Sequence, residues 1–147
     1  MHHLAIMRRE WGLTAKIASG SKKIESRWYV HKVSPWGKIA AGDTVFFKDS
    51  GRAVNLIAQV EKVLQYSDLT PGKVRAILVE YGKDDGIDES DIEKFYGLFK
   101  NRRYCLLIFL RNPQAIEPFE ISKKGFGAMT AWISINDINK IKLSQDC

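Results

Sequence analysis

The longest apolar stretch in the sequence covers residues 104–110 and reads YCLLIFL. It is long enough for one buried strand, whereas a helix that crosses a bilayer needs about 20 apolar residues. All other apolar segments are shorter, or are interrupted by Gly, Pro or charged residues. The chain is therefore expected to form its core from several short strands and helices, with no association with membranes.

The alternation of apolar and polar residues predicts a set of short strands. The predicted strands are residues 23–30, 44–48, 55–66, 104–110 and 128–135. Pro113 is expected to end the strand at residues 104–110, and residues 115–121 form a further extended segment, which we place at a sheet edge because Pro118 interrupts it. Residues 3–7 alternate too weakly to separate a strand from a lead-in, and residues 136–143 close the chain in a conformation that the pattern does not determine.

Helical spacing and capping residues predict two to three helices, at residues 9–19, 70–81 and 88–99. Thr70 and Pro71 are typical of a helix start, and Asp88 or Ser90 can cap the third helix. Trp11 is expected to face the core from the first helix. Five to seven mostly antiparallel strands with these helices predict an α+β fold, a small barrel or curled sheet that forms a single domain over residues 1–147.

The formal net charge of +6 is unevenly distributed. Residues 1–52 carry ten Lys and Arg against four Asp and Glu, residues 53–100 carry six against nine, and residues 101–147 carry seven against four. If the two basic ends meet in the fold, they form a face that favours polyanions such as RNA or a nucleotide-like ligand. The alternative is that the positive charge only aids solubility.

The cysteines and the N-terminus indicate an intracellular protein. Cys105 lies inside the apolar stretch and is expected in the core, while Cys147 is the last residue. The two have no metal-ligand spacing, so no metal site or other cofactor is expected, and a reducing, cytoplasmic compartment is the natural reading. The first residues lack the apolar stretch and cleavage site of a secretory signal. No obligate protein partner is inferred.

One motif stands out, at residues 20–27, which read GSKKIESR. It resembles the signature G-x-K-x-x-E-x-R of the ASCH family, with all fixed positions matched by Gly20, Lys22, Glu25 and Arg27. The context is also similar, because a predicted helix precedes the motif and a predicted strand carries its second half. The resemblance is strongest over residues 9–66.

The resemblance implies a PUA-like pseudo-β-barrel with a ligand cleft next to the motif, and a function on or with RNA. Some similar proteins hydrolyse N4-acylated cytidine nucleosides, and others are ribonucleases. In the amidohydrolase branch the motif Lys is catalytic, and a Thr nucleophile occupies the position of Glu25. This sequence departs from that branch there, since a carboxylate cannot replace a hydroxyl as acyl acceptor without a change of chemistry. A third, downstream acidic residue has candidates in Glu89, Asp91 and Glu93.

The motif residues also suit a binding site on physical grounds. On an extended strand Glu25 and Arg27 share one face, and the flexible Lys22 can reach the same patch. The carboxylate would accept hydrogen bonds from a base or sugar, and the guanidinium fork would hold a phosphate or carbonyl pair. Lys22 would bind phosphate or, with a lowered pKa, act as a base. The alternative is that Glu25 and Arg27 form a structural salt bridge that closes the barrel.

Aromatic and basic residues are candidates for the walls of the cleft. Trp28, Trp36 and Trp132 are candidates for base stacking, with Trp36 the foremost, although core packing is the usual role of a tryptophan. The basic candidates are Lys48, Lys123 and Lys124, the last two in a glycine-containing loop. The pair Arg102-Arg103 and the isolated His31 are weaker candidates.

Three hypotheses follow. The first is an RNA- or nucleotide-binding domain with Lys22, Glu25 and Arg27 at the centre of its cleft. The second is a hydrolase of a modified nucleoside, or a ribonuclease, in which Lys22 is the base and Glu25 polarises the substrate or activates water. The third is a protein-interaction domain in which the motif is purely structural.

Overall fold

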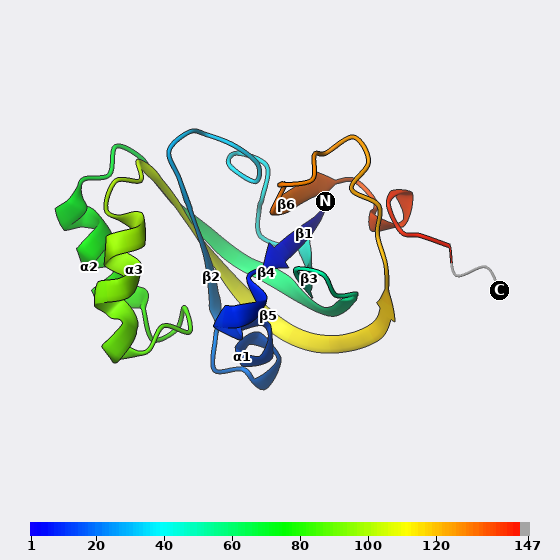
Figure 1. The fold of residues 1–147 in the computed structure, drawn as a ribbon, viewed down its shortest axis with the longest axis horizontal. Coiled ribbons are helices and arrows are strands. Elements are labelled where there is room, and N and C mark those ends of the chain that lie inside the picture. The colour runs from blue at the N-terminus through cyan, green and yellow to red at the C-terminus, as the bar shows by residue number, and fades with distance from the viewer. Residues whose placement is uncertain (145–147) are drawn as a thin grey trace.

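The computed structural model describes residues 1–144 and contains one six-stranded sheet with three α-helices (Figure 1). The strands are β1 (His2–Met7), β2 (Ile24–Tyr29), β3 (Thr44–Asp49), β4 (Val54–Tyr66), β5 (Tyr104–Phe119) and β6 (Trp132–Ile135). The α-helices are α1 (Leu13–Ser19), α2 (Pro71–Tyr81) and α3 (Ile92–Phe99), and short 3₁₀ turns occupy Arg9–Trp11, Glu89–Asp91 and Ile138–Lys140. The predicted α+β class, with a curled sheet flanked by helices, is confirmed.

The sheet has the strand order β2-β5-β4-β3-β1-β6. All neighbouring strands are antiparallel except β1 and β3, which are parallel. The weakly patterned residues 3–7 therefore belong to an interior strand, β1. Its residues Leu4 and Ala5 are consecutive and both fully buried, so both faces of β1 are covered. A strand that is covered on both faces loses the alternation from which sequence reasoning identifies strands.

β5 is longer than the sequence predicts. Pro113 was expected to end it, but the strand continues to Phe119. The register against β4 shifts between Ile57 and Gln59, and Asn112 adopts a positive φ of 51° beside the proline. A bulge of this kind accommodates a residue without a backbone donor. β2 pairs with β5 only as far as Phe109, so the proline-containing half lies at a sheet edge, as predicted.

The first and third helices begin later than predicted. Gly12, with φ 64°, separates the 3₁₀ turn Arg9–Trp11 from α1, so residues 9–19 do not form one helix. The Thr70 cap is confirmed, since its hydroxyl accepts from the Lys73 amide at 3.3 Å. The third helix begins only at Ile92, and no side chain caps it. No helix within residues 1–144 is long and apolar enough to span a membrane.

α2 and α3 lie together at one end of the sheet (Figure 1). They pack on β2 and β5 through a cluster of buried side chains that includes Trp28, Leu78, Phe95 and Leu107. Cys105 is fully buried in this cluster, as predicted, while Cys147 lies outside the described residues. The motif strand β2 therefore lies at the edge of the sheet, directly beside the helical layer.

Candidate functional site

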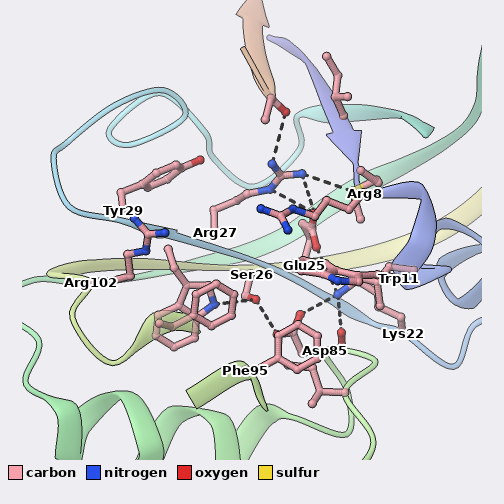
Figure 2. A pocket seen from close by; sticks show the side chains of 17 residues that line it. Arg8, Trp11, Lys22, Glu25, Ser26, Arg27, Tyr29, Asp85, Phe95 and Arg102 are labelled. Carbon is pink, nitrogen blue, oxygen red and sulfur yellow. Dashed lines mark hydrogen bonds and ion pairs between the residues drawn. The ribbon is translucent and has the colours of Figure 1, made fainter. Parts of the chain in front are cut away.

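A cavity of about 270 Å³ lies beside β2, between the turn Arg9–Trp11 and α3 (Figure 2). Its polar lining is formed by the titratable or hydroxyl residues Lys22, Glu25, Ser26 and Asp85 and by three arginines, Arg8, Arg27 and Arg102. Its aromatic lining is formed by Trp11, Trp28, Tyr29, Phe95 and Phe99. The motif residues Lys22, Glu25 and Arg27 thus share one cavity, which we call the motif pocket.

Lys22 lies at the floor of the motif pocket and is only 2% exposed. Its ammonium donates to the carbonyl of Ile24 at 2.6 Å, to the carbonyl of Asp85, and to the Asp85 carboxylate at 2.7 Å. Glu25 Oε1 lies 3.3 Å away. The lysine stem packs against Gly86, where a Cβ would lie 3.1–3.3 Å from it. The glycine therefore provides the space for this buried side chain.

The electrostatics of Lys22 oppose a role as general base. Burial alone would lower the pKa of this ammonium, but the charges and hydrogen bonds of Asp85 and Glu25 outweigh burial and raise the pKa above its usual value. The lowered pKa that a base at Lys22 requires is therefore absent. Lys22 is a permanent cation that holds two carboxylates at the pocket floor.

Asp85 is the downstream acidic residue that contacts the motif lysine. It is buried and accepts a hydrogen bond from the Ser26 hydroxyl at 2.6 Å, and that hydroxyl in turn accepts from Trp28 Nε1 at 3.0 Å. Burial raises the pKa of Asp85, with a further contribution from Glu25 and opposition from Lys22.

The downstream acidic residues that sequence reasoning offered lie elsewhere. None of Glu89, Asp91 and Glu93 lines the motif pocket, and Glu93 forms an exposed salt bridge with Arg75. Asp85 was missed because it stands in an acidic run, in which the sequence does not distinguish the one buried carboxylate.

Glu25 and Arg27 share a face and form a pair, as predicted. Glu25 Oε2 accepts from Arg27 Nε at 3.2 Å and from Nη2 at 2.9 Å. Arg27 also donates to the carbonyl of Ala131 at 3.3 Å and contacts Met7 Sδ at 3.3 Å. Ala131 immediately precedes β6, so this guanidinium joins the two edge strands of the sheet, β2 and β6. These contacts support a structural contribution of the pair alongside any ligand contact.

The tryptophans are placed differently from the prediction. Trp28 lines the pocket but is buried and stacked on Phe99, with ring centroids 4.9 Å apart. Trp36 does not line the pocket. Trp132 does not line it either; it is buried, and the Arg27 guanidinium carbon lies 5.0 Å from the centroid of its ring. Trp11, which we expected in the core, packs against the buried cluster around Phe95 but is only half-buried and also lines the pocket. The break at Gly12 explains this position, because it removes Trp11 from the apolar face of α1.

The predicted basic wall residues also lie away from the motif pocket. Lys48 is buried in β3, and Lys123 donates to the carbonyl of Ala128 within its own loop at 2.6 Å. Neither of these residues lines the pocket, nor do Lys124 and the exposed His31.

Besides Lys22 and Arg27, the pocket has two further cations, both arginines that lie just outside a strand. Arg8 follows β1, and Arg102 precedes β5. The sequence shows the pair Arg102-Arg103, but it does not indicate which of the two faces the pocket. Within residues 1–144, no three His, Cys, Asp or Glu side chains group as a metal site.

The fold is that of solved ASCH structures. An ASCH protein from Zymomonas mobilis is 17% identical, with a TM-score of 0.65 over 92% of this chain and 87% of that chain. A single-residue variant of that protein superposes with a TM-score of 0.67 at 16% identity, over 95% and 93% of the two chains. A hypothetical protein at 19% identity gives 0.52, with 79% of this chain and 100% of that chain covered. No protein-family model and no curated relative matches the sequence. The ASCH-type, PUA-like fold that the motif suggested is confirmed.

Proposed function

We propose that this chain, which has the fold of the ASCH proteins, binds one nucleobase of RNA or of a nucleotide-like ligand in the motif pocket. The observation that carries the proposal is the position of Glu25, a carboxylate held between two cations at the floor of a cavity with aromatic walls. The cavity, at about 270 Å³, is slightly smaller than the roughly 300–1,000 Å³ typical of sites for drug-sized ligands. This volume suits one base and excludes a duplex.

The floor offers hydrogen-bond acceptors to a base. A carboxylate has about four acceptor positions, and Lys22 and Arg27 together approach Glu25 with three nitrogen atoms. Acceptor capacity therefore remains for an exocyclic amino group or a ring N–H. Sites built to pair polar groups discriminate strongly against ligands that lack them, because the buried group is then left without a partner.

The walls offer stacking surfaces. Trp11 meets Phe95 edge to face at a centroid distance of 5.1 Å, and its half-buried ring lines the cavity. Stacking of a base on an aromatic side chain contributes about 1–3 kcal/mol and tolerates any base. We therefore assign affinity to Trp11 and selectivity to the polar floor.

The proposal is tested by calorimetric titration of the protein with the four ribonucleosides and with a short single-stranded RNA. Trp11→Ala should weaken binding by about 1–3 kcal/mol. Trp36→Ala is the matched control, because Trp36 is also half-buried but lies off the pocket, and it should bind as wild type does. Equal affinities of these two variants, or no binding by the wild type, would exclude the motif pocket as the site.

One observation favours hydrolysis as a second candidate function. The Ser26 hydroxyl donates to the buried Asp85 carboxylate at 2.6 Å within the motif pocket, an arrangement of nucleophile and base. In this version the Ser26 oxygen attacks the acyl carbonyl carbon of an N4-acylated cytidine, Asp85 takes up the hydroxyl proton and returns it to the departing cytidine nitrogen, and water then releases the acyl group from Ser26 as a carboxylic acid. Mass spectrometry of N4-acylated cytidine nucleosides and short RNA, incubated with wild type and with Ser26→Ala, decides the matter. Products with wild type alone would establish an enzyme, and intact substrates with both proteins would leave the binding function.

A further inference from the structure

Arg102 contributes a buried hydrogen-bond donor to the lining of the motif pocket. Its Nε atom is buried and has no partner among the described residues, whereas Arg27 donates from all three of its guanidinium nitrogens. The backbone around Arg102 is fixed, because its amide donates to the carbonyl of Phe99 at 2.9 Å and the next amide donates to the carbonyl of Tyr29 at 2.9 Å. A buried donor without a partner is uncommon in folded proteins.

The charged side chains that line the pocket also leave an excess of positive charge. Lys22 and Arg27 are matched by the carboxylates of Glu25 and Asp85. Arg8 and Arg102 form no ion pair within residues 1–144, and both line the cavity. The side chain of Arg8 lies over the ring of Trp11, 4.8 Å from its centroid. The motif pocket therefore carries two positive charges that form no ion pair with any group of residues 1–144.

Resting on the proposed function, we infer that the motif pocket takes a phosphorylated ligand, with Arg102 as the phosphate-binding residue and Arg8 as a second cation. The planar guanidinium fork matches the geometry of phosphate oxygens. A phosphate monoester carries about −1.5 to −2 charge at neutral pH, which balances the two free arginines. Figure 2 shows Arg102 beside Tyr29, apart from the Lys22 and Asp85 floor. The base thus occupies the floor, and the phosphate lies on the Arg102 side of the cavity.

The test compares each ribonucleoside with its 5′- and 3′-monophosphates and with the dinucleoside monophosphates, by calorimetry at constant ionic strength. In the wild type, a monophosphate should bind about 10- to 100-fold more tightly than its nucleoside. Arg102→Gln should remove this preference, so that a monophosphate and its nucleoside bind this variant with nearly equal affinity. Arg103→Gln is the matched control, because this neighbouring arginine is exposed and does not line the pocket, and the preference should persist there.

The outcomes of this experiment distinguish a free nucleotide from an internal phosphate of RNA. They also test the phosphate site separately from the base site. Tighter binding of monophosphates alone indicates a free nucleotide or a strand end, and equally tight binding of dinucleoside monophosphates indicates an internal phosphate of RNA. If nucleosides bind but phosphate adds nothing, or if Arg102→Gln retains the preference, the phosphate site is overturned and the base site stands. If no compound binds, both are overturned. Arg102→Lys, which keeps the charge and loses the fork, provides the same comparison should the glutamine variant fold poorly.

Discussion

Lys22 and Asp85 meet at the floor of the motif pocket, with Nζ 2.7 Å from Oδ1, although 63 positions separate them in the chain. The contact ties the start of β2 to the loop that follows α2, and so fixes the motif against the helical layer. Both side chains are almost completely removed from water. A buried pair of this kind tolerates the loss of one partner poorly, because the other charge is left without compensation.

Lys22→Met should therefore destabilise the fold by about 3–5 kcal/mol, because Asp85 and Glu25 remain as buried carboxylates with one cation between them. The neighbouring, exposed Lys23 provides the control, and Lys23→Met should lie within about 0.5 kcal/mol of wild type. Urea unfolding monitored by tryptophan fluorescence measures both. Equal stability of the two variants would show that the ammonium contributes no more than a surface charge.

Gly86→Ala should destabilise the fold by roughly 1–3 kcal/mol. The residue has a φ of +80°, which disfavours a side chain, and the new Cβ would press on the stem of Lys22. Gly97→Ala is the matched substitution, because Gly97 lies within α3 with no atom near the added Cβ. It should stabilise by about 0.5–1 kcal/mol. Thermal unfolding of the two variants should therefore shift in opposite directions.

Arg27→Ala should lower both stability and ligand affinity, since the guanidinium holds Glu25 and joins β2 to the segment before β6. We expect a loss of about 1–3 kcal/mol in the free energy of unfolding. Adding Glu25→Gln to this variant should recover part of the loss, because the carboxylate no longer lacks its partner. The double variant then measures binding in a stable background. Unchanged nucleoside affinity in it would support a purely structural motif.

Acidification should lower the free energy of unfolding because of the pair His3 and Asp43. His3 Nε2 lies 2.9 Å from Asp43, yet burial outweighs this carboxylate and lowers the pKa of the imidazole below 6.5. A histidine with a lowered folded-state pKa leaves stability unaffected above about pH 6.5. As the pH falls below that value, the unfolded chain gains a proton that the folded one does not bind, so stability decreases until the folded-state pKa is passed.

The measurement is the free energy of unfolding from pH 7.5 down to pH 5. His3→Gln should have a shallower profile than wild type across this range, since it removes one proton taken up on unfolding. The variant His31→Gln, at an exposed position, should show the same change in the free energy of unfolding between pH 7.5 and pH 5 as the wild type. Parallel profiles of wild type and His3→Gln would contradict the assignment.

The sequence predicts those features of the fold that depend on local pattern. β4 follows from the alternation of Leu56, Ala58 and Val60, and the start of α2 follows from the Thr70 cap. The motif pocket is predicted in part, because Glu25 and Arg27 are two residues apart on one strand and must share a face. The bulge at Pro113 was not predictable from the proline alone, since it depends on the register with β4.

The remaining site residues depend on tertiary packing. Asp85 is selected from an acidic run by the position of the loop after α2 relative to Lys22, and no local signal encodes that relation. Trp11 packs against the core as expected but also lines the pocket, because Gly12 separates it from α1. Helical spacing describes a face only where the helix is continuous.

The position of β1 has a consequence for the order in which the sheet is completed. Its backbone pairs with β3 on one side and with β6 on the other, where His2 lies opposite Ile135. During synthesis the β6 edge of β1 must remain without its partner until residues 132–135 leave the ribosome. Non-local pairings of this kind slow folding, and open strand edges favour association between chains. Among the six strands of this sheet, β1 is the earliest in the chain and the one whose second neighbour is completed last.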